Sequence, residues 1–237
     1  MILTFLLTSA CFCQELISKN AQELIDLFTN NLTKPFYKTA NKEISASWQQ
    51  NIDLLYHLYK SQVIPEHLKT EQPVFTGAEF DLMQVFELLD HISMSPGYQL
   101  AYSYFFQPSF SGYPIFYACK NPFSGTPDES TNCQRGGLDY VIADGSELGY
   151  LQWLLLHEMG DHFYIYWHAD YFKDKLFVST EEALTSILLE IEHSLNDQQR
   201  AQAGLIDPEP RFLLDEETIK IRAVWFTKFG GFFETYY

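Results

Sequence analysis

The sequence predicts an α+β protein in which N-terminal helices precede a largely antiparallel sheet with helices packed on it. Two observations support this class. Apolar residues recur at helical spacing in several segments of residues 14–92, whereas beyond residue 97 several short segments alternate apolar side chains at every second position. Strands and helices then mix without the regular alternation of a parallel α/β sheet. We therefore expect one domain over residues 14–237, with a helical part at 14–92 and a mixed part at 93–237.

Three helices are expected in the first part. Residues 14–30 and 42–61 carry apolar side chains at helical spacing, and Pro65 follows the second helix as a stop signal. Thr76 and Glu79 have the spacing of a capping box, which predicts the start of a third helix. Residues up to 92 are accordingly expected to be helical.

The mixed part begins with a hairpin. The segment GYQLAYSYFF alternates aromatic and apolar side chains, PSFSGYP turns the chain, and YPIFYA returns it, so residues 97–118 are predicted to form two antiparallel strands. A short apolar strand is expected at 138–143, and a helix from about residue 147. Near the other end of the sequence, TIKIRAVWFTKF and FFETYY flank Gly230-Gly231, which predicts a second hairpin.

The stretch LQWLLLHEMGDHFYIYWHAD, residues 151–170, indicates a helix that gives way to a strand. Gly160 follows the last helical position, where glycine is a common terminator. The next residues, HFYIYWHA, are mostly aromatic and β-branched, which favours a strand. KLFV at 175–178 is expected to return as its partner, and Ser179 with Glu182 forms a capping box that opens a further helix.

One face of the expected strand carries tyrosine and histidine in alternation. Such a face suits the binding of a protein or a sugar, because tyrosine offers an apolar ring beside a polar tip. The alternative is a face covered by a helix, with each polar tip hydrogen-bonded. The candidate binding residues are His162, Tyr164, Tyr166 and His168.

The same stretch contains a partial zinc-peptidase motif. In the H-E-x-x-H pattern the second ligand stands four residues after the first, but here that position is Asp161. A degenerate zinc hydrolase is therefore the alternative, with His157 and Asp161 as ligands, Glu158 as the catalytic residue, and Glu181 or Glu182 as a further ligand. The helix-stop and strand signals favour the interpretation without a metal, under which no cofactor is expected.

The charge of the chain limits its partners. Thirty-one acidic residues face 15 basic ones, which gives a formal net charge of −16. This excess disfavours nucleic acid, whose binding depends on Lys and Arg at the phosphates. No phosphate-binding glycine loop or nucleophile elbow is present in the sequence. We expect a non-catalytic binding domain with a protein partner. Besides the zinc hydrolase, an immunity or accessory protein that opposes a basic partner is the other alternative.

Export is predicted from the first residues and from the cysteines. MILTFLLTSACFCQ has the apolar run of a signal peptide ending at residue 13, and it is shorter than the roughly 20 residues that span a bilayer. TSAC approximates a lipoprotein box, so a lipid anchor at Cys11 is an option. Cys119 and Cys133 flank a turn-rich loop, which predicts a disulfide and an oxidising periplasmic or extracellular location.

Two segments, HISMSPGYQLAYSYFFQPSFSGYPIFYA and GDHFYIYWHADY, resemble an uncharacterised group of bacterial proteins. That group carries an H-x-S-M-x-x-G-Y hairpin and a later G-D-x-F-Y-x-x-W-H-A strand, and the resemblance covers about residues 75–178. It implies a helix-to-strand junction at 160–161 rather than a metal centre, and it supplies no activity. The matching residues are His91, Ser93, Met94, Gly97, Tyr98, Gly112, Pro114, Tyr117, Gly160, Asp161, Phe163, Tyr164, Trp167, His168 and Ala169.

Overall fold

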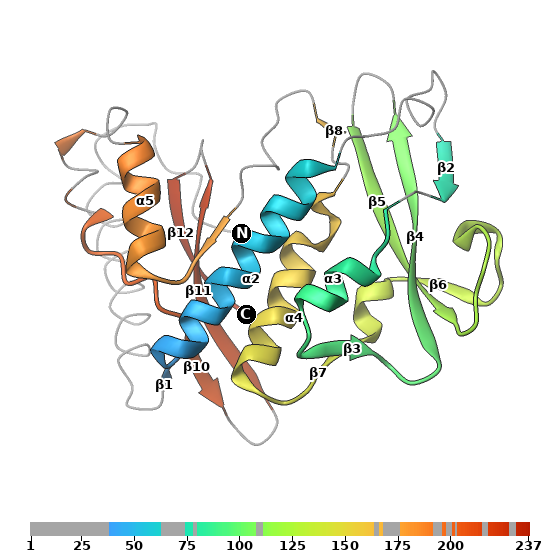
Figure 1. Ribbon diagram of the computed structural model, residues 1–237, viewed down its shortest axis with the longest axis horizontal. Coiled ribbons are helices and arrows are strands. Elements are labelled where there is room, and N and C mark those ends of the chain that lie inside the picture. The colour runs from blue at the N-terminus through green and yellow to red at the C-terminus, as the bar shows by residue number, and fades with distance from the viewer. Residues whose placement is uncertain are drawn as a thin grey trace, which may run out of the picture. The chain divides into compact units, whose positions relative to one another are not determined.

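The structure is a computed structural model, and its elements are drawn in Figure 1. It describes residues 38–62, 74–77, 80–107, 111–163, 166–167, 176–191, 196–197, 201, 203–214, 218–227 and 231–237. The chain divides into two compact units, a large one of residues 39–212 and 220–237 and a small one of residues 1–38 and 213–219. All the described helices lie in the large unit. The helix expected at 14–30, the signal segment and Cys11 lie outside the described residues.

Three of the expected helices are confirmed. They are α2 (Lys42–Ser61), α4 (Glu147–Met159) and α5 (Glu181–Ile191). The Asn41 side chain caps α2 by accepting a hydrogen bond from the Ile44 N–H at 2.9 Å. The N-cap of α5 is supplied by the Thr180 hydroxyl, which accepts from the Ala183 N–H, and not by Ser179. No helix in the described part of the chain has the length and apolar character to cross a membrane.

The prediction that a helix starts at Thr76 is wrong. Val74–Gly77 is instead strand β2, and the helix that follows is the short α3 (Met83–Leu88). Thr76 lies opposite Tyr104 in the pairing of β2 with a later strand, so a long-range ladder replaces the local cap. The helical part expected up to residue 92 therefore contains strands.

The hairpin predicted at 97–118 is confirmed as β4 (Tyr98–Gln107) and β5 (Ser111–Lys120). The two strands are antiparallel, from Tyr98 opposite Lys120 to Gln107 opposite Ser111. Their sheet has the order β2-β4-β5-β6, and β8 also pairs with β5. A separate two-stranded ladder joins β3 to β7. The short strands are β3 (Ile92–Met94), β6 (Cys133–Arg135), β7 (Val141–Ala143) and β8 (Tyr166–Trp167).

The second large sheet contains the other predicted hairpin. Strand β11 pairs with β12 from Arg222 opposite Tyr236 to Thr227 opposite Gly231, so the predicted hairpin is confirmed, although Gly231 belongs to β12 and not to the turn. Strand β9 also pairs with β11, so β8 and β9 belong to different sheets and the hairpin expected around residues 162–178 is wrong. The strands of this sheet are β1 (Lys38–Thr39), β9 (Leu176–Val178), β10 (Arg211–Leu214), β11 (Ile219–Thr227) and β12 (Gly231–Tyr236).

The change of structure at Gly160 is confirmed, although the strand starts later than expected. Helix α4 ends at Met159 and a 3₁₀ turn follows at Gly160–His162. Phe163 then enters the core fully buried, with its ring 4.3 Å from that of Phe80 and 4.9 Å from that of Tyr102. Burial of this aromatic ring fixes where the chain leaves the helix, because fully burying a phenylalanine side chain contributes about 1.5–3 kcal/mol.

Candidate functional site

The residues of the predicted zinc site have separate structural contacts. The His157 ring stacks on Trp153 at 3.7 Å, its Nδ1 lies 3.0 Å from the Trp153 carbonyl oxygen, and burial lowers the pKa of His157. Glu158 shares a hydrogen bond with the Tyr237 hydroxyl; burial, followed by the charge of Glu158, raises the pKa of that tyrosine. Asp161 lies in the 3₁₀ turn, 3.8 Å from His162.

Glu181 and Glu182 lie exposed in the first turn of α5. Within the described residues, which include all five of the predicted zinc-site side chains, no three or more His, Cys, Asp or Glu gather as metal ligands would. The alternative of a zinc hydrolase therefore has no geometric support in the described chain.

The tyrosine and histidine face is only partly described. His162 belongs to the 3₁₀ turn and not to a strand, and its side chain is 11% exposed. Tyr166 begins β8, whereas Tyr164 and His168 lie outside the described residues. The alternating face stays a prediction, except that His162 is not on the strand.

A histidine, an aspartate and a serine meet where the β3–β7 ladder joins α4. His91 Nδ1 lies 2.7 Å from Asp144 Oδ2 and 3.4 Å from Ser146 Oγ. A catalytic triad needs the serine and the carboxylate on opposite ring nitrogens, whereas here both approach Nδ1. The Ser146 hydroxyl donates to Asp144 and accepts from the Gly149 N–H, and so caps α4. This cluster therefore connects the β3–β7 ladder to the start of α4 and does not have the geometry of a catalytic triad.

A groove is the feature of the described chain that best fits a binding site. It has a volume of about 740 Å³, inside the range of roughly 300–1,000 Å³ common for ligand sites. Its walls come from α3, β3, β4 and the loop that follows β5. Most of the lining is apolar or aromatic, and the lining residues are Phe80, Asp81, Leu82, Met83, Phe86, Ile92, Ser93, Met94, Tyr98, Gln99, Leu100, Ala101, Tyr102, Asn121, Phe123, Ser124, Gly125 and Pro127.

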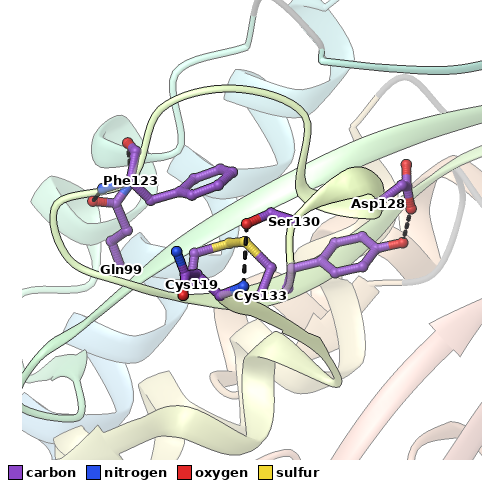
Figure 2. The surroundings of a disulfide bond; sticks show 8 residues. Gln99, Cys119, Phe123, Asp128, Ser130 and Cys133 are labelled. Atoms are coloured by element: carbon purple, nitrogen blue, oxygen red, sulfur yellow. Dashed lines mark hydrogen bonds between the residues drawn. A yellow bond between two sulfur atoms is a disulfide. The ribbon is translucent and has the colours of Figure 1, made fainter.

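The disulfide holds one wall of this groove. The predicted pair Cys119 and Cys133 is bonded, with 2.05 Å between the sulfur atoms, and it joins β5 to β6 across the base of the loop (Figure 2). Inside the loop, Gln99 of β4 donates to the Phe123 carbonyl at 2.9 Å and accepts from the Phe123 N–H at 3.1 Å. The Phe123 wall is therefore fixed to the sheet before any ligand arrives.

Asp128 attaches the same loop at a further point. The Tyr117 hydroxyl of β5 donates to the Asp128 carboxylate and accepts from Arg135 Nε at 3.2 Å. Burial and the Asp128 hydrogen bond raise the pKa of Tyr117 further above its ordinary value of 10.0, at which a phenol is already protonated and able to donate at physiological pH. The disulfide, Gln99 and Tyr117 together preorganise the loop.

Sequence reasoning found the disulfide but not the groove. The groove combines segments distant along the chain, and most of its residues are ordinary apolar side chains. The segment HISMSPGY, which carries part of the resemblance, supplies Ser93, Met94 and Tyr98 to the lining of the groove. The resemblance itself does not indicate a groove at these residues.

Comparisons with known proteins identify no family for this chain. No protein-family model matches the sequence, and neither a curated protein nor a solved structure matches it. A function must therefore be inferred from the geometry and charge of the chain itself.

Proposed function

We propose that this chain is an exported, non-catalytic binding domain whose groove takes an apolar segment of a partner protein. The observation that carries the proposal is the groove of about 740 Å³ with an apolar lining and a preorganised wall. A fixed wall favours binding, because less conformational entropy is lost when the ligand arrives. Met83 and Met94 add adaptable thioether side chains to a lining that also contains aliphatic and aromatic residues.

The charges favour a neutral or basic partner. Asp81 is the one charged side chain among the described residues that line the groove. The whole chain carries a formal charge of −16. A fatty acid or a phosphorylated ligand would need a cationic anchor, because an unpaired anion in an apolar site is costly. An apolar protein segment with lysine or arginine beside it meets no such cost, and the acidic surface attracts it.

Export is part of this proposal. The disulfide supports it, because such bonds persist in oxidising compartments. The apolar first residues support it as a signal peptide, with lipidation at Cys11 as one form of it. The alternating tyrosine and histidine strand stays a second candidate surface for the same partner.

The proposal is tested by selecting random peptides on the folded protein and measuring their affinity for two matched variants. Met83 is 61% exposed in the groove, and Leu189 is 66% exposed on α5 outside it. Met83→Lys places a positive charge in the groove, whereas Leu189→Lys makes the same change elsewhere. Selected peptides are expected to bind Met83→Lys at least about tenfold more weakly, since a bound apolar segment would cover the new charge and the lysine or arginine of the partner would be repelled. They should bind Leu189→Lys as they bind the original chain.

Two results would contradict the proposal. One is a selection that enriches no peptide. The other is a set of peptides that bind both variants equally well, which would place their site away from the groove.

A further inference from the structure

Strand β4 has an open edge beside the groove. Strand β2 covers only its second half, from Gly77 opposite Ser103 to Val74 opposite Phe106, and Figure 1 shows β2 beside the upper part of β4. Strand β5 pairs with the other edge of β4 along its whole length. Within the described residues, the first half of β4 therefore has a strand neighbour on one side only.

The hydrogen bonds show which backbone groups face this open edge. Tyr98 N–H donates to the Ser95 carbonyl at 3.1 Å, and its opposite residue Lys120 donates to Asn132 at 3.0 Å, so these two exchange no bonds. Bonded and non-bonded pairs alternate along an antiparallel ladder. Leu100, two residues further along β4, accordingly directs its N–H and C=O away from β5 and toward the open edge.

The groove lies across this edge and not over one face of the sheet. Its lining includes five consecutive residues of β4, Tyr98 to Tyr102, whereas a cavity over one face would meet only alternate residues. Tyr98 packs on Tyr140, with ring centroids 4.6 Å apart, and Tyr102 packs on Phe163. Gln99, which points to the opposite face, bonds to Phe123. The groove thus reaches side chains of both faces around the edge.

We propose that the partner segment binds in an extended conformation and adds a strand to the open edge of β4, bonding to the backbone of Leu100. This inference rests on the proposed function and specifies its mode. In strand addition the main chain supplies affinity, and alternate side chains supply specificity through flanking pockets. The apolar lining selects apolar residues at every second position of the partner. Asp81 lines the groove, and the whole chain carries a formal net charge of −16, so lysine or arginine is favoured next to these apolar residues of the partner.

The probe for this mode is the synthetic octapeptide Lys-Val-Thr-Phe-Thr-Val-Thr-Lys, which has Val, Phe and Val at alternate positions, Thr after each of them and Lys at both ends. Two sets of N-methylated versions remove single N–H donors, one set at odd and the other at even positions. In an added strand only one set faces β4. In one set, the methyl group at the N–H that meets the Leu100 carbonyl is therefore expected to weaken binding about tenfold, through the lost bond and the steric clash. The other set is expected to leave binding nearly unchanged.

Two protein variants complete the test. Leu100→Ala and Leu100→Pro both lose the apolar side chain, but only the proline also loses the N–H. Proline is tolerated at a strand edge whose N–H is not used in the ladder. Leu100→Pro is expected to bind the octapeptide about tenfold more weakly than Leu100→Ala. Circular dichroism of both variants checks that they fold, and the N-methyl series does not depend on either of them.

The outcomes separate the mode of binding from the function. Equal sensitivity to both N-methyl sets, combined with weaker binding to Met83→Lys, would overturn strand addition and leave a groove that binds peptides. No binding of the octapeptide, while peptides from the random selection bind the groove, would also overturn it. If neither the octapeptide nor any selected peptide binds, the proposed function fails as well.

Discussion

Asp144 shows how a candidate catalytic residue can have a structural role. Hydrogen bonds from the Ser146 hydroxyl and the Ser146 N–H, followed by one with His91, lower the pKa of Asp144 to about 2 from the ordinary 3.8. The carboxylate is therefore the form that the folded chain prefers. Asp144 therefore connects the β3–β7 ladder to the start of α4. Its carboxylate bonds to Ser146, and its N–H donates to the His91 carbonyl at 3.0 Å.

We predict that Asp144→Asn lowers the free energy of unfolding at neutral pH, and that the difference from the original chain shrinks in acid. A lowered folded-state pKa contributes stability above the unfolded value of 3.8, and this contribution is lost as the pH falls toward about 2. Urea unfolding at several pH values measures the effect. Ser146→Ala should reduce the pH dependence only in part, because the Ser146 N–H and His91 still bond to Asp144, and it should add a loss that does not change with pH, because α4 loses its N-cap. A difference that stays constant from pH 7 to pH 2 would contradict this account.

Phe163 is the residue on which the core next to the groove depends. It is fully buried and contacts the rings of Tyr59, Phe80, Tyr102 and Phe116. We predict that Phe163→Ala lowers the free energy of unfolding by about 3–5 kcal/mol, through lost burial and a cavity. Leu205→Ala, at a side chain 85% exposed, should change it by less than about 0.5 kcal/mol. Chemical denaturation compares the two, and similar losses would show that Phe163 is not central to the core.

At the scale of elements, short-range signals predicted the structure well. The periodicity of 42–61, the helix expected from about residue 147 and the alternation of 97–118 each depend on residues close together in the sequence, and each corresponds to an element that is observed. The errors come from pairing between distant strands. Thr76 has the local signature of a cap but pairs with Tyr104, and the two strands around residue 170 join different sheets. No local pattern specifies such partners.

The disulfide loop was predicted from its two cysteines, but its attachment to β4 was not. We predict that replacing Cys119 and Cys133 together by serine lowers the free energy of unfolding by about 3 kcal/mol, because a loop of about 15 residues regains its entropy in the unfolded chain. The loss of a fixed Phe123 wall should also weaken binding of the octapeptide. Denaturation and peptide titration of the double variant measure both effects. Unchanged values would show that the loop holds its place without the bond.

At the scale of the whole molecule, charge and groove point to the same class of partner. The formal charge of −16 favours a basic protein, and the groove lining offers no cation to an acidic ligand. Composition predicted the first of these properties. The second emerges only when α3, β3, β4 and the disulfide loop come together, since none of these segments carries an unusual chemical motif by itself. This is why the sequence indicates a kind of partner but not the groove that we propose for it.

The charge also predicts how binding depends on salt. Association of the lysine-ended octapeptide should weaken as the salt concentration rises from about 0.05 to 0.5 M, because screening reduces the attraction between exposed charges. A version with glutamate in place of lysine should bind more weakly at low salt and approach the lysine peptide at high salt. Isothermal titration at several salt concentrations measures both peptides. Equal affinities at low salt would remove charge from the account of specificity.

Amide hydrogen exchange at Leu100 tests the proposed strand addition, because that N–H faces the open edge of β4. Exchange is followed by NMR with and without the octapeptide, with the Ala101 N–H, which belongs to the β4–β5 ladder, as an internal reference. We predict that the peptide strongly slows exchange at Leu100 and affects Ala101 much less. A peptide that binds the groove while exchange at Leu100 stays unchanged would contradict it.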